Sequence, residues 1–132
     1  MKYFTLKQAE DLIPDFEKIF SDIAALADRA EAKAESAGRL EQSQAKAAEL
    51  EIEKAQIRFL AAQIDALFQK IADTGALPKG YNPPLVDFPF RLGRKEVYLC
   101  WSGGEKKIGY YHGIEEGFAG RHPLPSGRPA PD

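Results

Sequence analysis

A repeat of apolar side chains at helical spacing, running through residues 5–74, is the feature that most constrains the fold. Up to residue 37 the apolar positions recur every three or four residues, and in the second half the period is seven. Such spacing places the apolar side chains on one face of a helix. The seven-residue repeat is carried by Leu50, Ile57, Ile64 and Ile71. The sequence therefore predicts two long amphipathic helices.

Local signals mark the expected ends of both helices. Thr5, with Gln8 three residues later, forms a capping box at the start of the first helix. Pro14 lies inside the pattern, and because the spacing continues past it we expect one bent helix rather than two. Gly38 and Gly75 are the expected ends of the first and second helix. A short turn at Gly38 makes the two helices antiparallel.

The periodicity changes after the second helix, where strand-forming and turn-forming residues replace the helical pattern. Residues 76–85 contain three prolines, so we expect an irregular connector there. Residues 97–101 and 108–112 are rich in β-branched and aromatic side chains and flank a glycine-containing turn. This arrangement predicts a β-hairpin. Residues 86–90 supply a third strand if the sheet is larger than a hairpin.

These signals together predict an α+β protein. We expect a long antiparallel helical hairpin in residues 1–75 and a β-rich segment in residues 76–124. The second is a small C-terminal antiparallel β-hairpin or three-stranded sheet packed at the open end of the helical hairpin, since a lone two-stranded hairpin is marginal in water. A chain of 132 residues suits one domain, expected to span residues 1–124. The proline-rich residues 125–132 are expected to be a disordered tail.

Charge and composition exclude several classes of function. The net charge of -2, with no concentrated basic face, argues against nucleic-acid binding. No run of 18 uninterrupted apolar residues exists, and the N-terminus lacks the apolar region of a signal peptide. We therefore expect no membrane segment and a cytoplasmic location. The single cysteine, Cys100, permits no intrachain disulfide, which fits a reducing compartment.

The apolar stripes are wider than two helices alone can bury. We therefore expect the helical hairpin to form a homodimer in a four-helix arrangement. The turn end of the first helix is rich in alanine, which favours a helix but buries little surface. This alanine-rich tip contains Ala24, Ala25, Ala27, Ala30, Ala32, Ala34 and Ala37. It is a candidate contact for a protein partner.

The densest set of reactive side chains lies in the β-rich segment. If a helical turn follows the last strand, His112, Glu115 and Glu116 come together, and such a set can hold a divalent metal. A divalent metal is the one cofactor that the sequence suggests. The residues available to complete the site are Asp87, Glu105 and Cys100. The alternatives for His112 are a structural histidine held by a carboxylate at a strand end, or a general acid or base.

Five residues are further candidates for ligand binding, namely Asp87, Cys100, Trp101, Glu105 and Arg121. Strand alternation places Tyr98 and Cys100 on one face, with Leu99 and Trp101 on the other. Cys100 is either a small buried thiol or a nucleophile activated by His112. Arg121 either binds an anion or forms an ion pair inside the fold. The internal carboxylates considered as its partner are Glu115, Glu116 and Asp87.

Several motifs, spread over nearly the whole chain, resemble one family of bacterial and archaeal proteins. They are Tyr3-Phe4-Thr5-Leu6, Leu12-Ile13-Pro14, Leu85-Val86-Asp87-Phe88-Pro89, Glu96-Val97-Tyr98-Leu99-Cys100-Trp101, Ile108-Gly109-Tyr110-Tyr111-His112 and Gly117-Phe118-Ala119-Gly120-Arg121. The chain looks like a member of the family called domain of unknown function 2203. The motifs in residues 85–124 are the specific ones, because any amphipathic hairpin would resemble the helical half. The resemblance implies no particular activity.

The sequence therefore predicts function only in outline. No residue stands out as catalytic, so the sequence leaves open whether the protein is an enzyme. The favoured interpretation is a non-enzymatic, dimeric interaction or scaffold protein. The alternative is a protein that binds a metal or a small ligand, with or without enzymatic activity, at a site around His112.

Overall fold

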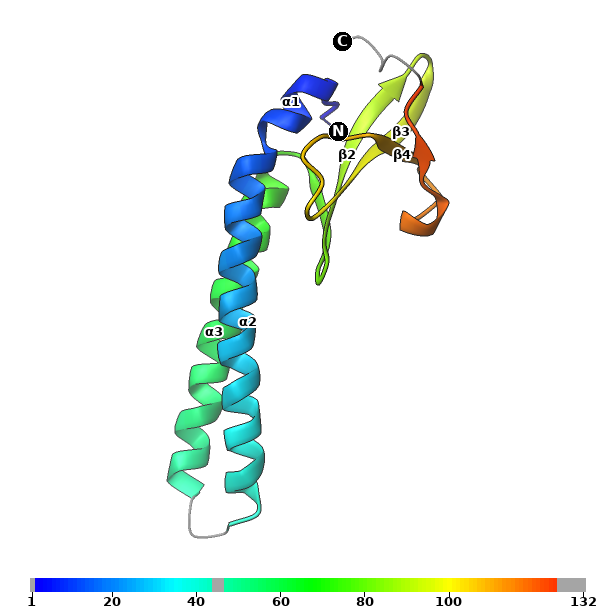
Figure 1. The fold of residues 1–132 in the computed structure, drawn as a ribbon. Coiled ribbons are helices and arrows are strands. Elements are labelled where there is room, and N and C mark those ends of the chain that lie inside the picture. Colours follow the sequence, from blue (N-terminus) through cyan, green and yellow to red (C-terminus); the bar gives the residue numbers. More distant parts are fainter. Residues whose placement is uncertain (1, 44–46, 126–132) are drawn as a thin grey trace. The chain divides into compact units, whose positions relative to one another are not determined.

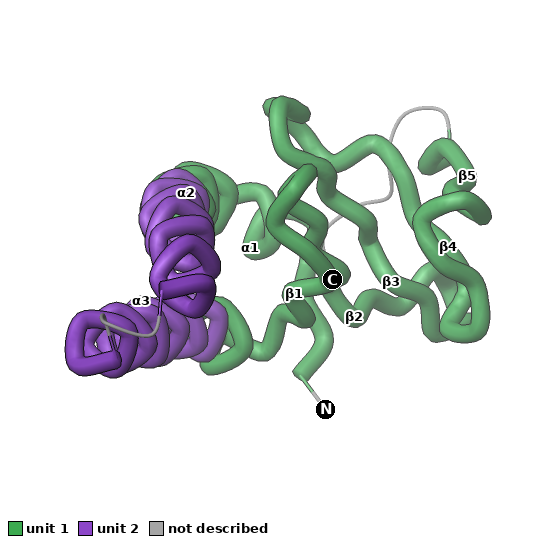
Figure 2. The backbone as a smooth tube through the Cα atoms, turned by 90° about the horizontal axis from the view of Figure 1, so that it is seen from below, with its two compact units in different colours: residues 1–20, 70–132 green, residues 21–69 purple. Residues whose placement is uncertain are grey.

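In the computed structural model, which describes residues 2–43 and 47–125, α-helices precede β-strands along the chain (Figure 1). This arrangement confirms the predicted α+β class. The chain divides into two compact units, coloured separately in Figure 2. The sheet unit contains residues 1–20 and 70–132, and the helix unit contains residues 21–69. The first 20 residues, predicted as part of the helical hairpin, thus belong with the sheet.

The N-terminal helices begin as predicted but are divided where one bent helix was expected. The Thr5 hydroxyl accepts a hydrogen bond from the Gln8 amide at 3.0 Å, and the Gln8 side chain accepts one from the Thr5 amide at 2.9 Å. Helix α1 spans Leu6–Asp11, and α2 spans Ile13–Glu41 after a break at Leu12. Pro14 lies in the first turn of α2, where a missing amide donor costs little. The expectation of a single helix was therefore wrong.

The helix unit consists of most of α2 and α3, which spans Ala47–Asp73. The two helices contact each other through polar side chains, including a 2.7 Å hydrogen bond from Lys33 Nζ to Gln56 Oε1. The prediction that α2 ends at Gly38 was wrong, because the helix continues to Glu41. A glycine inside a helix costs about 1 kcal/mol. Burial of its neighbour Ala37, 7% exposed, helps to offset that cost.

Among the described residues, five antiparallel strands form the sheet, where a hairpin or three strands were predicted. They are β1 (Leu77–Tyr81), β2 (Pro84–Leu92), β3 (Lys95–Ser102), β4 (Tyr110–Gly113) and β5 (His122–Pro123). Each strand pairs with the next one in sequence, in the order β1-β2-β3-β4-β5. The 3₁₀ helix η2 (Phe118–Gly120) lies between the last two strands. The prediction for residues 97–101 and 108–112 thus captured the middle of a larger sheet.

The proline-containing segment 76–85 was predicted to be irregular, but it contains β1 and the start of β2. Strand β1 is an edge strand, where a proline amide can face away from the ladder. Pro84 is the first residue of β2, another position that tolerates proline. The register shifts between Pro78 and Gly80, which leaves Lys79 as the extra residue of a β-bulge. Proline content therefore marked the edge of the sheet instead of excluding strands.

The third strand expected in residues 86–90 is part of the longer β2, which passes through Pro89 and continues to Leu92. The last pair between β1 and β2 joins Leu77 to Asp87. On the β1 side of β2, Pro89 therefore has no neighbouring strand. The Pro89 carbonyl instead accepts a 2.9 Å hydrogen bond from the Phe4 amide. Because no ladder on this side requires a donor from residue 89, proline is tolerated within the strand.

One face of the sheet packs against the first 20 residues and forms an apolar core. The Phe88 ring meets Phe4 edge-on at 5.2 Å and stacks with Phe16 at 5.9 Å between ring centroids. Phe20 approaches Trp101 at 6.0 Å. The strand residues of this face are Val86, Phe88, Phe90, Val97, Leu99 and Trp101, none more than 1% exposed. The alternation predicted for residues 97–101 is confirmed on this face. We call it the aromatic face.

Residues 126–132, most of the predicted tail, lie outside the described part of the chain. Within residues 2–43 and 47–125, no helix combines the length and apolar character needed to cross a membrane.

Candidate functional site

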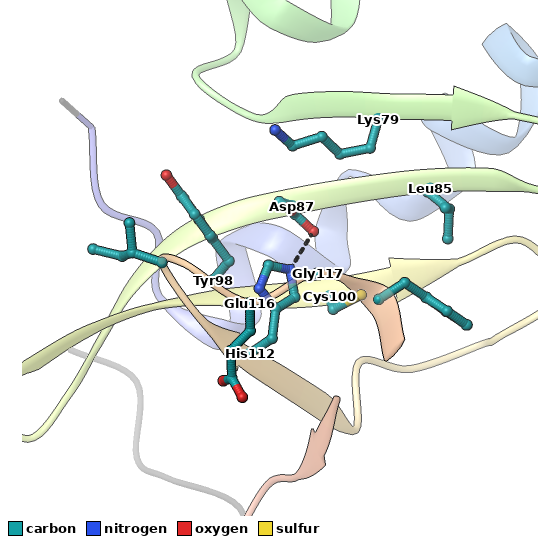
Figure 3. Close-up of a pocket in the computed structure, with 10 residues that line it drawn as sticks. Lys79, Leu85, Asp87, Tyr98, Cys100, His112, Glu116 and Gly117 are labelled. Carbon is teal, nitrogen blue, oxygen red and sulfur yellow. Dashed lines mark hydrogen bonds and ion pairs between the residues drawn. The ribbon is translucent and has the colours of Figure 1, made fainter. Parts of the chain in front are cut away.

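The opposite face of the sheet carries three buried polar side chains from three adjacent strands. Asp87 on β2 is paired in register with Cys100 on β3. His112 on β4 is paired with Tyr98, two residues before Cys100, so all three share one face. Their exposed fractions are 5% for Asp87, 2% for Cys100 and 2% for His112. We call this the polar face, and Figure 3 shows it in close-up.

The imidazole of His112 has a polar partner on each ring nitrogen. Its Nε2 lies 3.0 Å from Asp87 Oδ1, and its Nδ1 lies 2.9 Å from the carbonyl oxygen of Gly113. The thiol of Cys100 completes the group. One ligand atom from each residue (the Asp87 carboxylate oxygen, Cys100 Sγ and a His112 ring nitrogen) lies within 4.8 Å of the other two.

The contact between Asp87 and His112 needs either a shared proton or a metal ion when Nδ1 donates to Gly113. A carbonyl oxygen only accepts hydrogen bonds, so Nδ1 must carry the proton that it shares with Gly113. In a neutral imidazole, Nε2 would then present a lone pair to Asp87, and an ionised carboxylate presents lone pairs as well. Two lone pairs 3.0 Å apart repel unless a cation lies between them. That cation is a proton or a metal ion.

The position of Cys100 favours the expectation of a buried thiol over that of a nucleophile. Burial raises the pKa of the Cys100 thiol from 9.0 to about 11, against the lowering effect of nearby Arg121. The thiol is therefore protonated at neutral pH. Both nitrogens of His112 are also engaged, by Asp87 and Gly113, so neither is available to accept the thiol proton. A nucleophilic cysteine requires such a base or a lowered pKa.

A cavity of about 250 Å³ lies over the polar face. Asp87, Cys100 and His112 all contribute to its lining, and Tyr98 lies beside His112 with 5.5 Å between the ring centroids. The other lining residues are Lys79, Leu85, Ile114, Glu116, Gly117 and Phe118. Figure 3 shows Lys79 on β1 and Asp87 on β2 among these residues. The buried triplet is therefore next to a space that a small molecule can enter.

Glu115 and Glu116 were predicted to join His112 on a helical turn, but the residues after β4 form a non-helical turn. The Glu116 carboxylate accepts a 2.6 Å hydrogen bond from the Gly113 amide and lies 3.2 Å from His122 Nε2. These contacts, the amide first, lower the pKa of Glu116. Glu115 is exposed. Within the described residues, the group with metal-ligand geometry contains Asp87 and Cys100 with His112, and neither glutamate.

Arg121 forms the internal ion pair that was one of its two expected roles, with a partner that was not considered. Its Nη2 donates to Glu105 Oε1 at 2.8 Å and Oε2 at 3.0 Å, and to the Cys100 carbonyl at 3.0 Å. The guanidinium also lies over the rings of Tyr110, at 4.1 Å, and Phe118, at 4.7 Å. Arg121 thus connects the backbone of Cys100 with the cavity wall at Phe118.

Four of the sequence candidates do not line the cavity, namely Trp101, Glu105, Glu115 and Arg121. Trp101 lies on the aromatic face, and its indole N–H donates to the Glu105 carbonyl at 2.9 Å. The Glu105 carboxylate accepts from the Ser102 amide at 2.8 Å as well as from Arg121. Trp101 and Glu105 therefore hold the turn that follows β3. Sequence reasoning missed Lys79, because it lies in the segment expected to be irregular, and Ile114, which is not a reactive residue type.

The comparisons with known proteins identify a family and no characterised relative. A family model described as "Uncharacterized conserved protein (DUF2203)" matches residues 2–124. No curated protein matches the chain, and no solved structure does. The match covers both units of the fold and every residue of the polar face.

Proposed function

Since this chain belongs to the DUF2203 family, whose description names no activity, we propose a function from its site: a protein that binds a divalent transition metal through Asp87, Cys100 and His112. The observation that carries the proposal is that one ligand atom from each of these three buried residues lies within 4.8 Å of the other two, and that His112 Nε2 and Asp87 Oδ1 face each other at 3.0 Å. A metal ion in place of the shared proton satisfies both lone pairs. It also gives the buried Cys100 sulfur a partner.

The donor set fits zinc better than magnesium or calcium. Thiolate sulfur and imidazole nitrogen are the ligands that zinc prefers, whereas the two lighter metals select oxygen. Tetrahedral zinc with bonds of 2.0–2.3 Å places its ligand atoms roughly 3.3–3.7 Å apart. The three atoms lie within 4.8 Å of one another, so shifts on the order of 1 Å would complete the coordination. A metal would also ionise the thiol, whatever its pKa in the metal-free protein.

The surroundings of His112 resemble the outer shell of a metal-binding histidine. Such a histidine commonly donates its second ring N–H to a carbonyl or carboxylate, which fixes the ring. Here Nδ1 donates to the Gly113 carbonyl, and the Gly113 amide is held by Glu116 at 2.6 Å. Glu116 therefore supports the proposed metal site indirectly, through the backbone of Gly113.

The test is to bind cobalt to protein produced without a histidine tag and treated with a chelator. We expect one equivalent of Co²⁺, a thiolate-to-cobalt absorption band, and displacement of the cobalt by Zn²⁺. Cys100→Ala should abolish the band. The matched control is His122→Gln, which removes the exposed histidine paired with Glu116 and should leave the band unchanged. A folded protein that takes up no cobalt, or binds it without a thiolate band, would overturn the proposal.

The helix unit favours a second function, homodimerisation. Ile52 and Phe59, seven residues apart on one face of α3, are 58% and 67% exposed. Large apolar side chains exposed at this spacing are typical of a helix that packs on another chain. This supports the dimeric interaction or scaffold role expected from the sequence. The contact of the alanine-rich tip with a protein partner stays a prediction.

Light scattering tests the dimer directly. We expect the mass of a dimer for the native chain and of a monomer for a double variant with Ile52→Lys and Phe59→Lys. The control substitutes Ala61 and Ala72, two exposed alanines on another face of α3, by lysine in the same way. A native chain that stays monomeric at high concentration would rule out this second function.

A further inference from the structure

We infer that the cavity on the polar face binds a small carboxylate with an apolar body. Its carboxylate would take the open coordination position of the metal and lie near the ammonium group of Lys79. The apolar body would lie against Ile114 and Phe118. The inference rests on the metal site proposed above and names the class of ligand which that site would take.

The metal would keep one position open. Three protein ligands leave a tetrahedral ion one ligand short, which is the arrangement of zinc sites that bind substrates. In the described residues, the group with metal-ligand geometry stops at Asp87, Cys100 and His112. Glu116 also lines the cavity, but its carboxylate is occupied by the Gly113 amide and His122. Since all three ligand residues line the cavity, a molecule within it can reach the metal.

The charges around the cavity favour an anion. A divalent ion bound to one carboxylate and one thiolate forms a neutral centre. The charge of Glu116 is met by the Gly113 amide and the His122 ring. Lys79 is the positively charged side chain that lines the cavity. Within the described residues it forms no ion pair or hydrogen bond. Lys79 lies at the β-bulge of β1, and a β-bulge commonly changes the direction of a side chain.

The rim of the cavity favours an apolar body. Ile114 is 51% exposed and Phe118 is 47% exposed, which is unusual for two large apolar side chains flanking one turn. The Phe118 ring is held in place by the guanidinium of Arg121, 4.7 Å away. A volume of about 250 Å³ is smaller than the roughly 300–1,000 Å³ of cavities that hold drug-sized ligands. The ligand is therefore a small molecule.

A carboxylate fits these features better than a phosphate ester. Phosphate groups are commonly held by several donors, such as an arginine fork or a row of backbone amides at a helix N-terminus. The lining of the cavity supplies one unpaired cation, Lys79, and the guanidinium of Arg121, which lies against Phe118, is committed to Glu105. One cation and one metal position suit a ligand with a single negative charge.

The test uses cobalt-loaded protein and phenylacetate as the probe. We expect saturable changes in the visible cobalt spectrum on titration with phenylacetate, because the carboxylate enters the coordination shell. Phenylacetamide, which is neutral and of nearly the same shape, should bind at least about tenfold more weakly. Inorganic phosphate should not compete at equal concentration. If phenylacetamide binds as tightly as phenylacetate, or phosphate displaces it, the assignment of a carboxylate is wrong.

Two variants locate the bound probe. Lys79→Met should weaken phenylacetate about fivefold to tenfold, and Phe118→Ala by a similar factor, with the cobalt spectrum of the unliganded protein unchanged. The control Lys106→Met removes an exposed lysine that does not line the cavity, and it should have no effect. Equal affinity in all three variants would place the probe elsewhere and overturn the inference.

The same experiment separates this inference from the proposed function. If the native protein takes up no cobalt, the metal site itself fails. If cobalt binds with its thiolate band but the spectrum does not respond to phenylacetate, the metal site stands and the ligand class is overturned.

Discussion

The two faces of the sheet are buried equally well and by different chemistry. On the aromatic face, Phe88, Leu99 and Trp101 are fully buried among other apolar side chains. On the polar face, Asp87 and His112 are also buried, with exposed fractions of 5% and 2%. Burial of apolar surface stabilises a fold, whereas burial of charge is costly unless the charge is paired. The aromatic face is therefore explained by stability alone, whereas the polar face carries the paired groups for which we propose a function.

Trp101→Ala should produce the largest loss of stability, because Trp101 is fully buried against Phe20 on the aromatic face. Removing so large a side chain costs about 3–5 kcal/mol of unfolding free energy. Urea denaturation, followed by circular dichroism, measures this loss. The control is Tyr81→Ala, which removes a 42% exposed aromatic ring from the edge strand and should cost less than about 1 kcal/mol. Equal losses would mean that burial on this face does not decide stability.

The aromatic face could be predicted from the sequence and the polar triplet could not. Alternation along one strand is a local pattern, so it placed Leu99 and Trp101 opposite Tyr98 and Cys100 correctly. The contact between Asp87 and His112 joins residues 25 positions apart through the registers of two strand pairs. No local spacing encodes those registers. An incorrect helical turn after β4 therefore placed Glu115 and Glu116 beside His112, and Asp87 was only one of three residues expected to complete the site.

The helices show the same limit at their ends. The capping box at Thr5 and the long amphipathic pattern were predicted correctly, because both depend on neighbours within a few residues. Gly38 was expected to end α2, but the helix continues to Glu41, because a glycine penalty of about 1 kcal/mol is too small to end a long helix by itself. Strong local signals thus predicted the helices and the two strands after them, but not where each element ends.

The pH dependence of stability should reveal Cys100 on the polar face of metal-free protein. Burial raises the pKa of the folded thiol to about 11, from 9.0 when unburied. Between these values the folded state holds more protons than the unfolded state, so unfolding free energy falls as pH rises. The slope is about 1.4 kcal/mol per pH unit, and the contribution is complete below pH 9.

Comparison with Cys100→Ala isolates this effect from the titration of lysine and tyrosine side chains. The difference in unfolding free energy between the native chain and the variant should be constant up to pH 8.5. It should then shift by up to about 2–3 kcal/mol against the native chain by pH 11. A difference that stays constant over the whole range would show that the folded thiol titrates normally. In that case Cys100 would be more accessible than its 2% exposure indicates.

Asp87→Asn should have the smallest effect on stability and still separate the two faces most clearly. An asparagine amide can donate to His112 Nε2 in the place of Asp87, so the buried pair keeps a hydrogen bond without needing a cation. We expect a loss of about 1 kcal/mol or less. The same change removes an anionic metal ligand, so the affinity for Zn²⁺ should fall by about 100-fold or more.

Competition with a chromogenic chelator measures that affinity, and urea denaturation of the metal-free variant measures its stability. The matched control is Trp101→Phe, which alters the aromatic face and should reduce stability while leaving the affinity for Zn²⁺ unchanged. If Asp87→Asn loses several kcal/mol and keeps its metal affinity, the polar face is a second structural core whose buried pair holds only a proton. If Asp87→Asn loses metal affinity and Trp101→Phe loses stability, one face of the sheet maintains the fold and the other binds the metal.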